Sequence, residues 1–231
     1  MRARLLLLLA ALVLSLAGCR AVRETPSGAA APPQAAQPVP AGFTRYQVVS
    51  AESEIRALVY RDGPMARLGH NHVLSSRALH GEILLGGQDE PPRFTLTLPV
   101  ASFSVDDAAL RVEEGEDFPG AVDPDAIAGT RRNLLSTALL DGANFPDIRL
   151  TGREVAGQAP GYTVTVAIDV KGRSHEVQVP VLVEQRADGL RVTGQFTATH
   201  ADLGLTPFSV MGGLLSVRDE IRLRFRIVAR P

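Results

Sequence analysis

Two histidines separated by one residue, in the run Gly69-His70-Asn71-His72, are the residues best placed to do chemistry. Side chains two positions apart share a face of a β-strand, so His70 and His72 could hold one metal ion together. Zinc sites favour such imidazole ligands. A third ligand could come from the remaining histidines, which are His80, His175 and His200.

Other signs of a zinc site or of nucleophilic catalysis are missing from the sequence. It has no His-Glu-x-x-His motif and no Gly-x-Ser-x-Gly elbow, although Ser174-His175 and His200-Ala201-Asp202 bring suitable residue types together. We therefore predict that the protein is not an enzyme and has no metal or cofactor. A metal-dependent enzyme, or a metal-binding protein, that uses His70 and His72 is the alternative.

The single cysteine, Cys19, follows a segment typical of export signals. Two arginines lie within Met1–Arg4, and Leu5–Leu16 is an apolar run of about a dozen residues, which suits a signal peptide. A membrane-spanning helix would need about 20 apolar residues. The run Leu16-Ala17-Gly18-Cys19 resembles the lipobox that lipoprotein signal peptidase recognises.

This resemblance implies that residues 1–18 are removed and that Cys19 carries lipid. Two or more acyl chains anchor a protein stably to a membrane. We therefore expect a protein of the bacterial cell envelope that faces the periplasm. Arg20 stands where an aspartate would retain a lipoprotein at the inner membrane, which favours the outer membrane.

Residues 19–42 are predicted to form a linker, because Glu24–Gly42 consists mainly of Ala, Pro and Gln and has almost nothing to bury. Residues 43–231 then form one folded domain. The 24 basic and 25 acidic side chains nearly balance, only 5% of residues are aromatic and Trp is absent. These values argue against binding to nucleic acid, which uses basic surfaces and aromatic stacking.

The folded domain is dominated by alternation of apolar and polar residues, the pattern of a half-buried strand. In Tyr162–Val170, for example, every second side chain is Tyr, Val or Ile. Many such strands without alternating helices predict an all-β, antiparallel sandwich or barrel. Pro180 indicates an edge or a bulge. The candidate strands are 55–60, 72–77, 79–85, 94–100, 149–155, 162–170, 177–184, 190–197 and 221–228.

One helix is expected between Asp123 and Gly142, with Asp123 as its N-cap and Pro124 in its first turn. Its apolar residues share one face, and it could lie near one mouth of a barrel. The acidic stretch Asp106–Gly120, which contains Gly115 and Pro119, is predicted to be a mobile loop.

The apolar strand faces are the candidate binding surface, because a barrel of about eight strands is either filled by its own side chains or holds one small ligand. Periodicity alone leaves both possibilities open, and a filled barrel would act as a protein-interaction module. The candidate ligand-binding residues are Leu96, Leu98, Val164, Val166, Ile168, Val177, Val179, Val181, Val192, Phe196, Leu223 and Phe225.

The order of several short motifs, from about Tyr46 to Arg230, is similar to that of the YceI-like family of periplasmic, lipocalin-like proteins. The main ones are Tyr46-Gln47-Val48, Gly69-His70-Asn71-His72, Asn133-Leu134-Leu135, Phe145-Pro146-Asp147-Ile148 and Asp202-Leu203-Gly204-Leu205. Where members commonly have a Gly-Val-Thr turn, this chain reads Lys171-Gly172-Arg173-Ser174.

The resemblance implies an extended, eight-stranded antiparallel barrel around a tunnel for a long apolar chain, and it implies no chemistry. Combined with the predicted lipid on Cys19, it leads to one hypothesis. The protein is a membrane-anchored envelope protein that sequesters or carries an isoprenoid or fatty-acyl chain inside its barrel.

Overall fold

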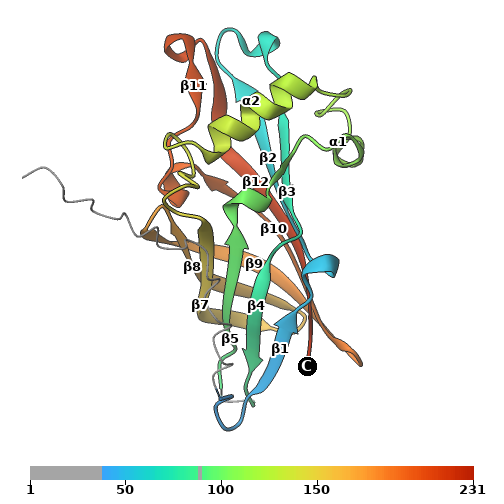
Figure 1. The fold of residues 1–231 in the computed structure, drawn as a ribbon. Coiled ribbons are helices and arrows are strands. Elements are labelled where there is room, and N and C mark those ends of the chain that lie inside the picture. Colours follow the sequence, from blue (N-terminus) through green and yellow to red (C-terminus); the bar gives the residue numbers. More distant parts are fainter. Residues whose placement is uncertain (1–37, 88–89) are drawn as a thin grey trace, which may run out of the picture. The chain divides into compact units, whose positions relative to one another are not determined.

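The computed structural model describes residues 38–87 and 90–231, and most of these residues form a closed antiparallel barrel (Figure 1). β1 pairs with both β4 and β12, which closes the ring and confirms the predicted eight-stranded, lipocalin-like barrel. In spatial order the ring within this part of the chain consists of β1 (Thr44–Val48), β4 (His80–Leu85), β5 (Arg93–Pro99), β7 (Asp147–Gln158), β8 (Gly161–Val170), β9 (Arg173–Arg186), β10 (Gly189–Thr199) and β12 (Leu215–Arg230).

Four further strands in the described part of the chain extend this ring. β2 (Glu54–Asp62) follows β1 after a single turn and pairs with β12 and with β3 (His72–Ser76). β3 in turn pairs with β6 (Ser104–Val105), and β11 (Ser209–Val210) pairs with the start of β12. The alternation had predicted the longer strands but not β1, β6 or β11.

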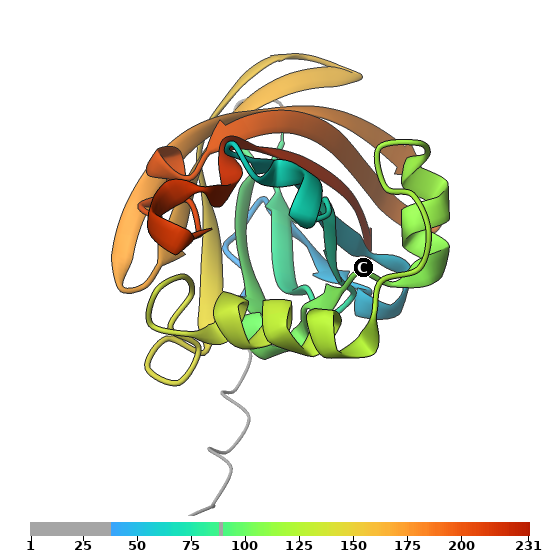
Figure 2. The same cartoon turned by 90° about the horizontal axis from the view of Figure 1, so that it is seen from above.

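Helix α2 (Pro124–Leu135) begins as predicted, because the Asp123 side chain accepts hydrogen bonds from the backbone N–H groups of Asp125 (2.8 Å) and Ala126 (3.4 Å). The predicted end at Gly142 is wrong. The helix ends at Leu135, and the chain turns back so that Gly142 N–H donates to the Leu135 carbonyl (3.0 Å). Seen from above, α2 lies along one side of the opening that the strands enclose (Figure 2).

The prediction of a mobile loop at Asp106–Gly120 is also wrong, because this stretch contains helix α1 (Ala108–Glu114). Asp107 caps helix α1. The acidic residues of α1 form ion pairs with arginines of neighbouring strands, and Arg56 of β2 pairs with Glu113 (2.6 Å) and Glu114 (3.0 Å). Acidic composition suggested solvation, whereas these residues hold α1 against the sheet.

Pro180 lies at an edge of the strand pairing and not at a bulge, the two possibilities that the sequence left open. Within β9 it pairs in register with Thr163 of β8, whereas the pairing of β9 with β10 covers only the residues after it, from Val181, which pairs with Gly194, onward. Proline cannot donate to a ladder of hydrogen bonds, so the ladder ends beside it.

The compact unit that contains the barrel spans Val39–Pro231. The predicted signal peptide, Cys19 and nearly all of the linker lie outside the described residues. Among the residues that the structure does describe, no helix is both long and apolar enough to cross a membrane.

Candidate ligand-binding site

The interior of the barrel contains a cavity of about 1060 Å³. Sites for small molecules and cofactors usually measure about 300–1,000 Å³, so this cavity has room for a large ligand. Val166 on β8 and Leu223 on β12 exemplify its walls, which consist mainly of aliphatic side chains. The barrel is therefore hollow, a point that the periodicity of the sequence had left open.

Eleven of the twelve predicted ligand-binding residues line this cavity. Val177 is not among the described residues that line it, and instead it packs against the edge of the buried core. The eleven are Leu96, Leu98, Val164, Val166, Ile168, Val179, Val181, Val192, Phe196, Leu223 and Phe225.

Sequence reasoning missed several other residues of the cavity wall. Ile55, Ala57 and Val59 of β2 line the cavity, and their alternation was visible in the sequence. Leu134 of α2 and Leu203, in a turn after β10, also line it. Neither of these two lies on a strand, so period-two patterning could not have found them.

Two glycines make room for aromatic rings in the cavity wall. A β-carbon on Gly194 would lie 2.4 Å from the Phe225 ring, and one on Gly152 would lie 2.6 Å from the Phe94 ring. Both distances are far below van der Waals contact, so neither ring could keep its position beside a larger residue. Because Phe225 and Phe94 line the cavity, these glycines help to set its shape.

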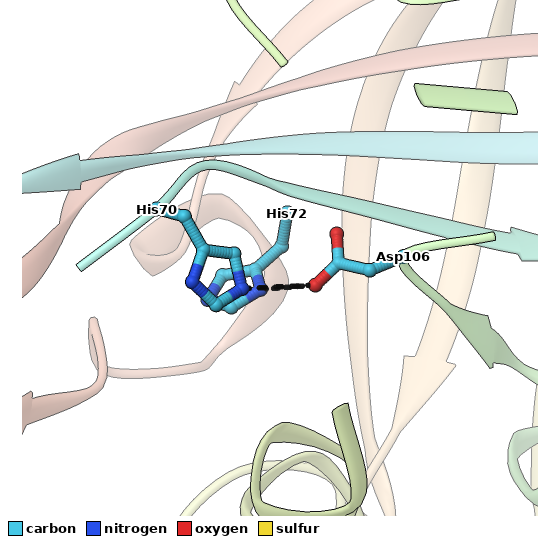
Figure 3. A group of neighbouring side chains, drawn as sticks. All are labelled: His70, His72 and Asp106. Atoms are coloured by element: carbon cyan, nitrogen blue, oxygen red, sulfur yellow. Dashed lines mark hydrogen bonds and ion pairs between the residues drawn. The ribbon is translucent and has the colours of Figure 1, made fainter. Parts of the chain in front are cut away.

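His70 and His72 line the same cavity and contact one carboxylate, that of Asp106 (Figure 3). His70 Nε2 lies 3.2 Å and His72 Nδ1 lies 2.8 Å from Asp106 Oδ2. The side chains of His70 and His72 are 31% and 17% exposed, whereas that of Asp106 is 0% exposed. The histidines therefore stand between the cavity and a fully buried carboxylate.

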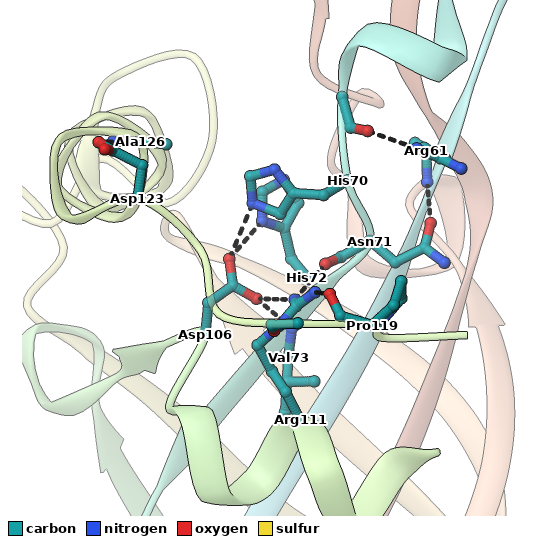
Figure 4. A network of polar contacts seen from close by, with 12 residues as sticks. Arg61, His70, Asn71, His72, Val73, Asp106, Arg111, Pro119, Asp123 and Ala126 are labelled. Atoms are coloured by element: carbon teal, nitrogen blue, oxygen red, sulfur yellow. Dashed lines mark hydrogen bonds and ion pairs between the residues drawn. The ribbon is translucent and has the colours of Figure 1, made fainter. Parts of the chain in front are cut away.

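The other carboxylate oxygen of Asp106 is held by separate donors (Figure 4). Asp106 Oδ1 accepts hydrogen bonds from Val73 N–H (2.9 Å) and from Arg111 Nη1 (2.9 Å). Arg111 of α1 is itself buried and also donates to the carbonyl of Asn71 (2.6 Å). Removing one partner of such a buried ion pair typically costs about 3–5 kcal/mol of folding stability. Through its hydrogen bonds with Val73 and Asn71, this pair fixes α1 to the start of β3.

Asn71, between the two histidines, fixes the backbone of this segment. Its side-chain nitrogen donates to the Asp117 carbonyl (2.7 Å), and its side-chain oxygen accepts from Arg61 N–H (3.0 Å). The segment is thus tied both to β2 and to the chain that follows α1. These bonds hold the backbone of the segment from which His70 and His72 contact Asp106.

Asp106 is ionised at neutral pH. Burial by itself would raise the pKa of its carboxyl group, but hydrogen bonds from His70, His72 and Val73 hold the pKa well below its usual value. An ionised carboxylate only accepts hydrogen bonds, so each ring nitrogen that faces Asp106 carries a hydrogen. The other ring nitrogens of His70 and His72 carry none while the rings are neutral.

The structure brings His70 and His72 together, as their spacing predicts, although β3 begins only at His72. The third member of the cluster is Asp106, and not one of the three histidines that the sequence suggested. His80 contacts the Ala78 carbonyl (3.0 Å), and His200 contacts the Asp219 carbonyl (2.8 Å). Asp106 stood in the predicted loop, and no sequence signal connected it with His70 or His72.

The fold and its cavity define a class of protein, the hollow antiparallel β-barrel whose interior is open to an apolar ligand. A family model described as YceI-like domain matches residues 46–229. The chain belongs to the YceI-like family, as its sequence motifs had indicated.

A solved structure shows the same fold. The crystal structure of Burkholderia cenocepacia BcnA is 17% identical, with a TM-score of 0.57 over 78% of this chain and 98% of that one. A Campylobacter jejuni YceI protein is 12% identical, with a TM-score of 0.48 over 68% of this chain and 84% of that one. Comparison with curated protein sequences finds no match.

Proposed function

We propose that the protein binds one long apolar chain, of the isoprenoid or fatty-acyl type, inside its barrel. The observation that carries this proposal is the cavity of about 1060 Å³ with its largely aliphatic wall. Membership of the YceI-like family, a family of lipid-binding barrels, supports the same ligand class. The cavity also disfavours the alternative of a filled barrel that acts only by binding another protein.

The affinity of such a site comes from the burial of apolar surface. Each Å² removed from water contributes about 25 cal/mol. Ordering a flexible chain costs part of this gain. An aliphatic wall makes few directional contacts, so we expect the length and apolar character of the ligand to matter more than its exact structure.

The proposed place of action is the cell envelope. Lipid on Cys19 would anchor the protein to a membrane, with the outer membrane favoured, and residues 19–42 would act as a tether for the barrel on the periplasmic side. A tethered barrel suits local capture or transfer of a lipid at one membrane. It does not suit transport over long distances.

A binding assay with a fluorescent fatty acid, whose emission rises in apolar surroundings, tests the proposal. We expect the delipidated protein to saturate at about one probe per chain, because the aliphatic residues of the strands line one cavity of about 1060 Å³. A long-chain isoprenoid alcohol should displace the probe, and butanol at the same concentration should not. A lack of saturable fluorescence would contradict binding of an apolar chain.

A further inference from the structure

We infer that His70, His72 and Asp106 form a binding site for a divalent metal ion, of the type that zinc occupies, in the wall of the cavity. Each residue offers one ligand atom, and the three atoms lie within 4.8 Å of one another. The sequence suggested only His80, His175 and His200 as a third ligand, whereas the structure provides Asp106. The inference does not depend on the proposed binding of lipid.

The distances suit a metal ion. Zinc binds nitrogen and carboxylate oxygen at about 2.0–2.2 Å, so two ligand atoms of one tetrahedral ion lie roughly 3.3 Å apart. The ring nitrogens of His70 and His72 are 3.2 Å and 2.8 Å from Asp106 Oδ2. All three ligand atoms lie within 4.8 Å of one another, so rotation of the two partly buried imidazole rings would bring their nitrogens and Asp106 Oδ2 around one ion.

Asp106 is oriented for this task by its neighbours. Arg111 and the Val73 N–H group occupy Oδ1, which leaves Oδ2 directed at the two histidines. Fixing a ligand through a second set of hydrogen bonds is the usual construction of a metal site. The buried Arg111 also balances the charge of Asp106, so the empty site places no unpaired charge in the interior.

Binding the ion requires only a change of tautomer at each histidine. In the metal-free protein the nitrogens that face Asp106 carry hydrogens. When the ion replaces these two hydrogens, each neutral imidazole carries its hydrogen on the other ring nitrogen. The set of two imidazoles and one carboxylate suits zinc and neighbouring first-row metals better than magnesium or calcium, which prefer all-oxygen ligands.

Three protein ligands leave one position of a tetrahedral ion open. His70 and His72 line the cavity, and Asp106 lies behind them, so the open position faces the cavity. Its ligand would be water or an oxygen atom of the molecule that occupies the cavity. The site would thus add one polar attachment point to an otherwise aliphatic wall.

Zinc titration of the metal-free full-length chain tests this inference. All variants should lack a polyhistidine tag and carry Cys19→Ala, so that neither a tag nor a thiol competes for the metal. By calorimetry we expect one Zn²⁺ per chain, with affinity at least tenfold lower in His70→Ala and in His72→Ala. His80→Ala, which changes an exposed histidine of β4 outside the cluster, should leave the affinity unchanged.

Zinc that binds equally well to the His70→Ala, His72→Ala double variant would overturn the inference, and so would the absence of stoichiometric binding. X-ray absorption at the zinc edge of the protein with both histidines intact covers the case in which these variants fail to fold. It should show two imidazole ligands and further oxygen or nitrogen neighbours. A spectrum without imidazole scattering would also overturn the inference.

Discussion

Val166→Arg should abolish the co-purification of an apolar lipid with the protein. Val166 is 7% exposed and lies on the inner face of β8, where it lines the cavity. A charged group in apolar surroundings without a partner costs several kcal/mol, and each 1.4 kcal/mol lowers affinity tenfold. We therefore expect at least a hundredfold loss of bound lipid, measured by organic extraction and mass spectrometry.

Thr163→Arg is the matched control, because Thr163 belongs to the same strand and its side chain is exposed. This variant should retain the lipid. Leu223→Trp provides a second test without a charge, since a larger side chain in the cavity wall occupies ligand volume. If Val166→Arg folds, as judged by circular dichroism, and carries as much lipid as the unmodified protein, the cavity is not the lipid site.

Cys19→Ala, in a chain whose residues 1–18 are replaced by a signal peptide that is cleaved without a lipidated cysteine, should move the protein from the membrane fraction to the soluble periplasmic fraction. The expected shift is nearly complete, because no other anchor is predicted and two acyl chains account for stable attachment. Fractionation with immunoblotting measures it, and labelling with radioactive palmitate should be lost in the same variant.

Arg20→Ala is the control for this change, since it alters the neighbouring residue and leaves the acceptor thiol in place. It should stay in the membrane fraction and keep the palmitate label. If Cys19→Ala stays with the membrane, the lipidation model is incorrect, whereas the barrel and its cavity would be unaffected.

The strands of the second half of the chain could be predicted from sequence because they are long and regular. In β8 and β10 large apolar residues recur at alternate positions, and Val166, Ile168, Val192 and Phe196 among them line the cavity. The first half was harder to predict, because β1 and β2 are pieces of one path interrupted by Ser50–Glu52. Short pieces such as β6 contain too few residues to show any period.

Residues of the candidate site could be predicted where a local pattern marks them, but not where only contacts with distant residues do. Val166 and its neighbours were identifiable because every second residue of a strand faces inward. Asp106 was not, because its partners His70 and His72 are more than 30 residues away in sequence. The helix that carries Arg111 was missed for a related reason, since its acidic residues are stabilised by arginines of other strands.

Native mass spectrometry of residues 39–231, exported behind a cleavable signal peptide, tests the central claim most directly. These residues form the compact unit that contains the whole cavity, and they lack the predicted lipidation site. We predict one bound molecule per chain, identified after extraction as an isoprenoid or fatty-acyl compound. A protein that is empty when isolated, and that also takes up no such compound when it is offered, would contradict the claim.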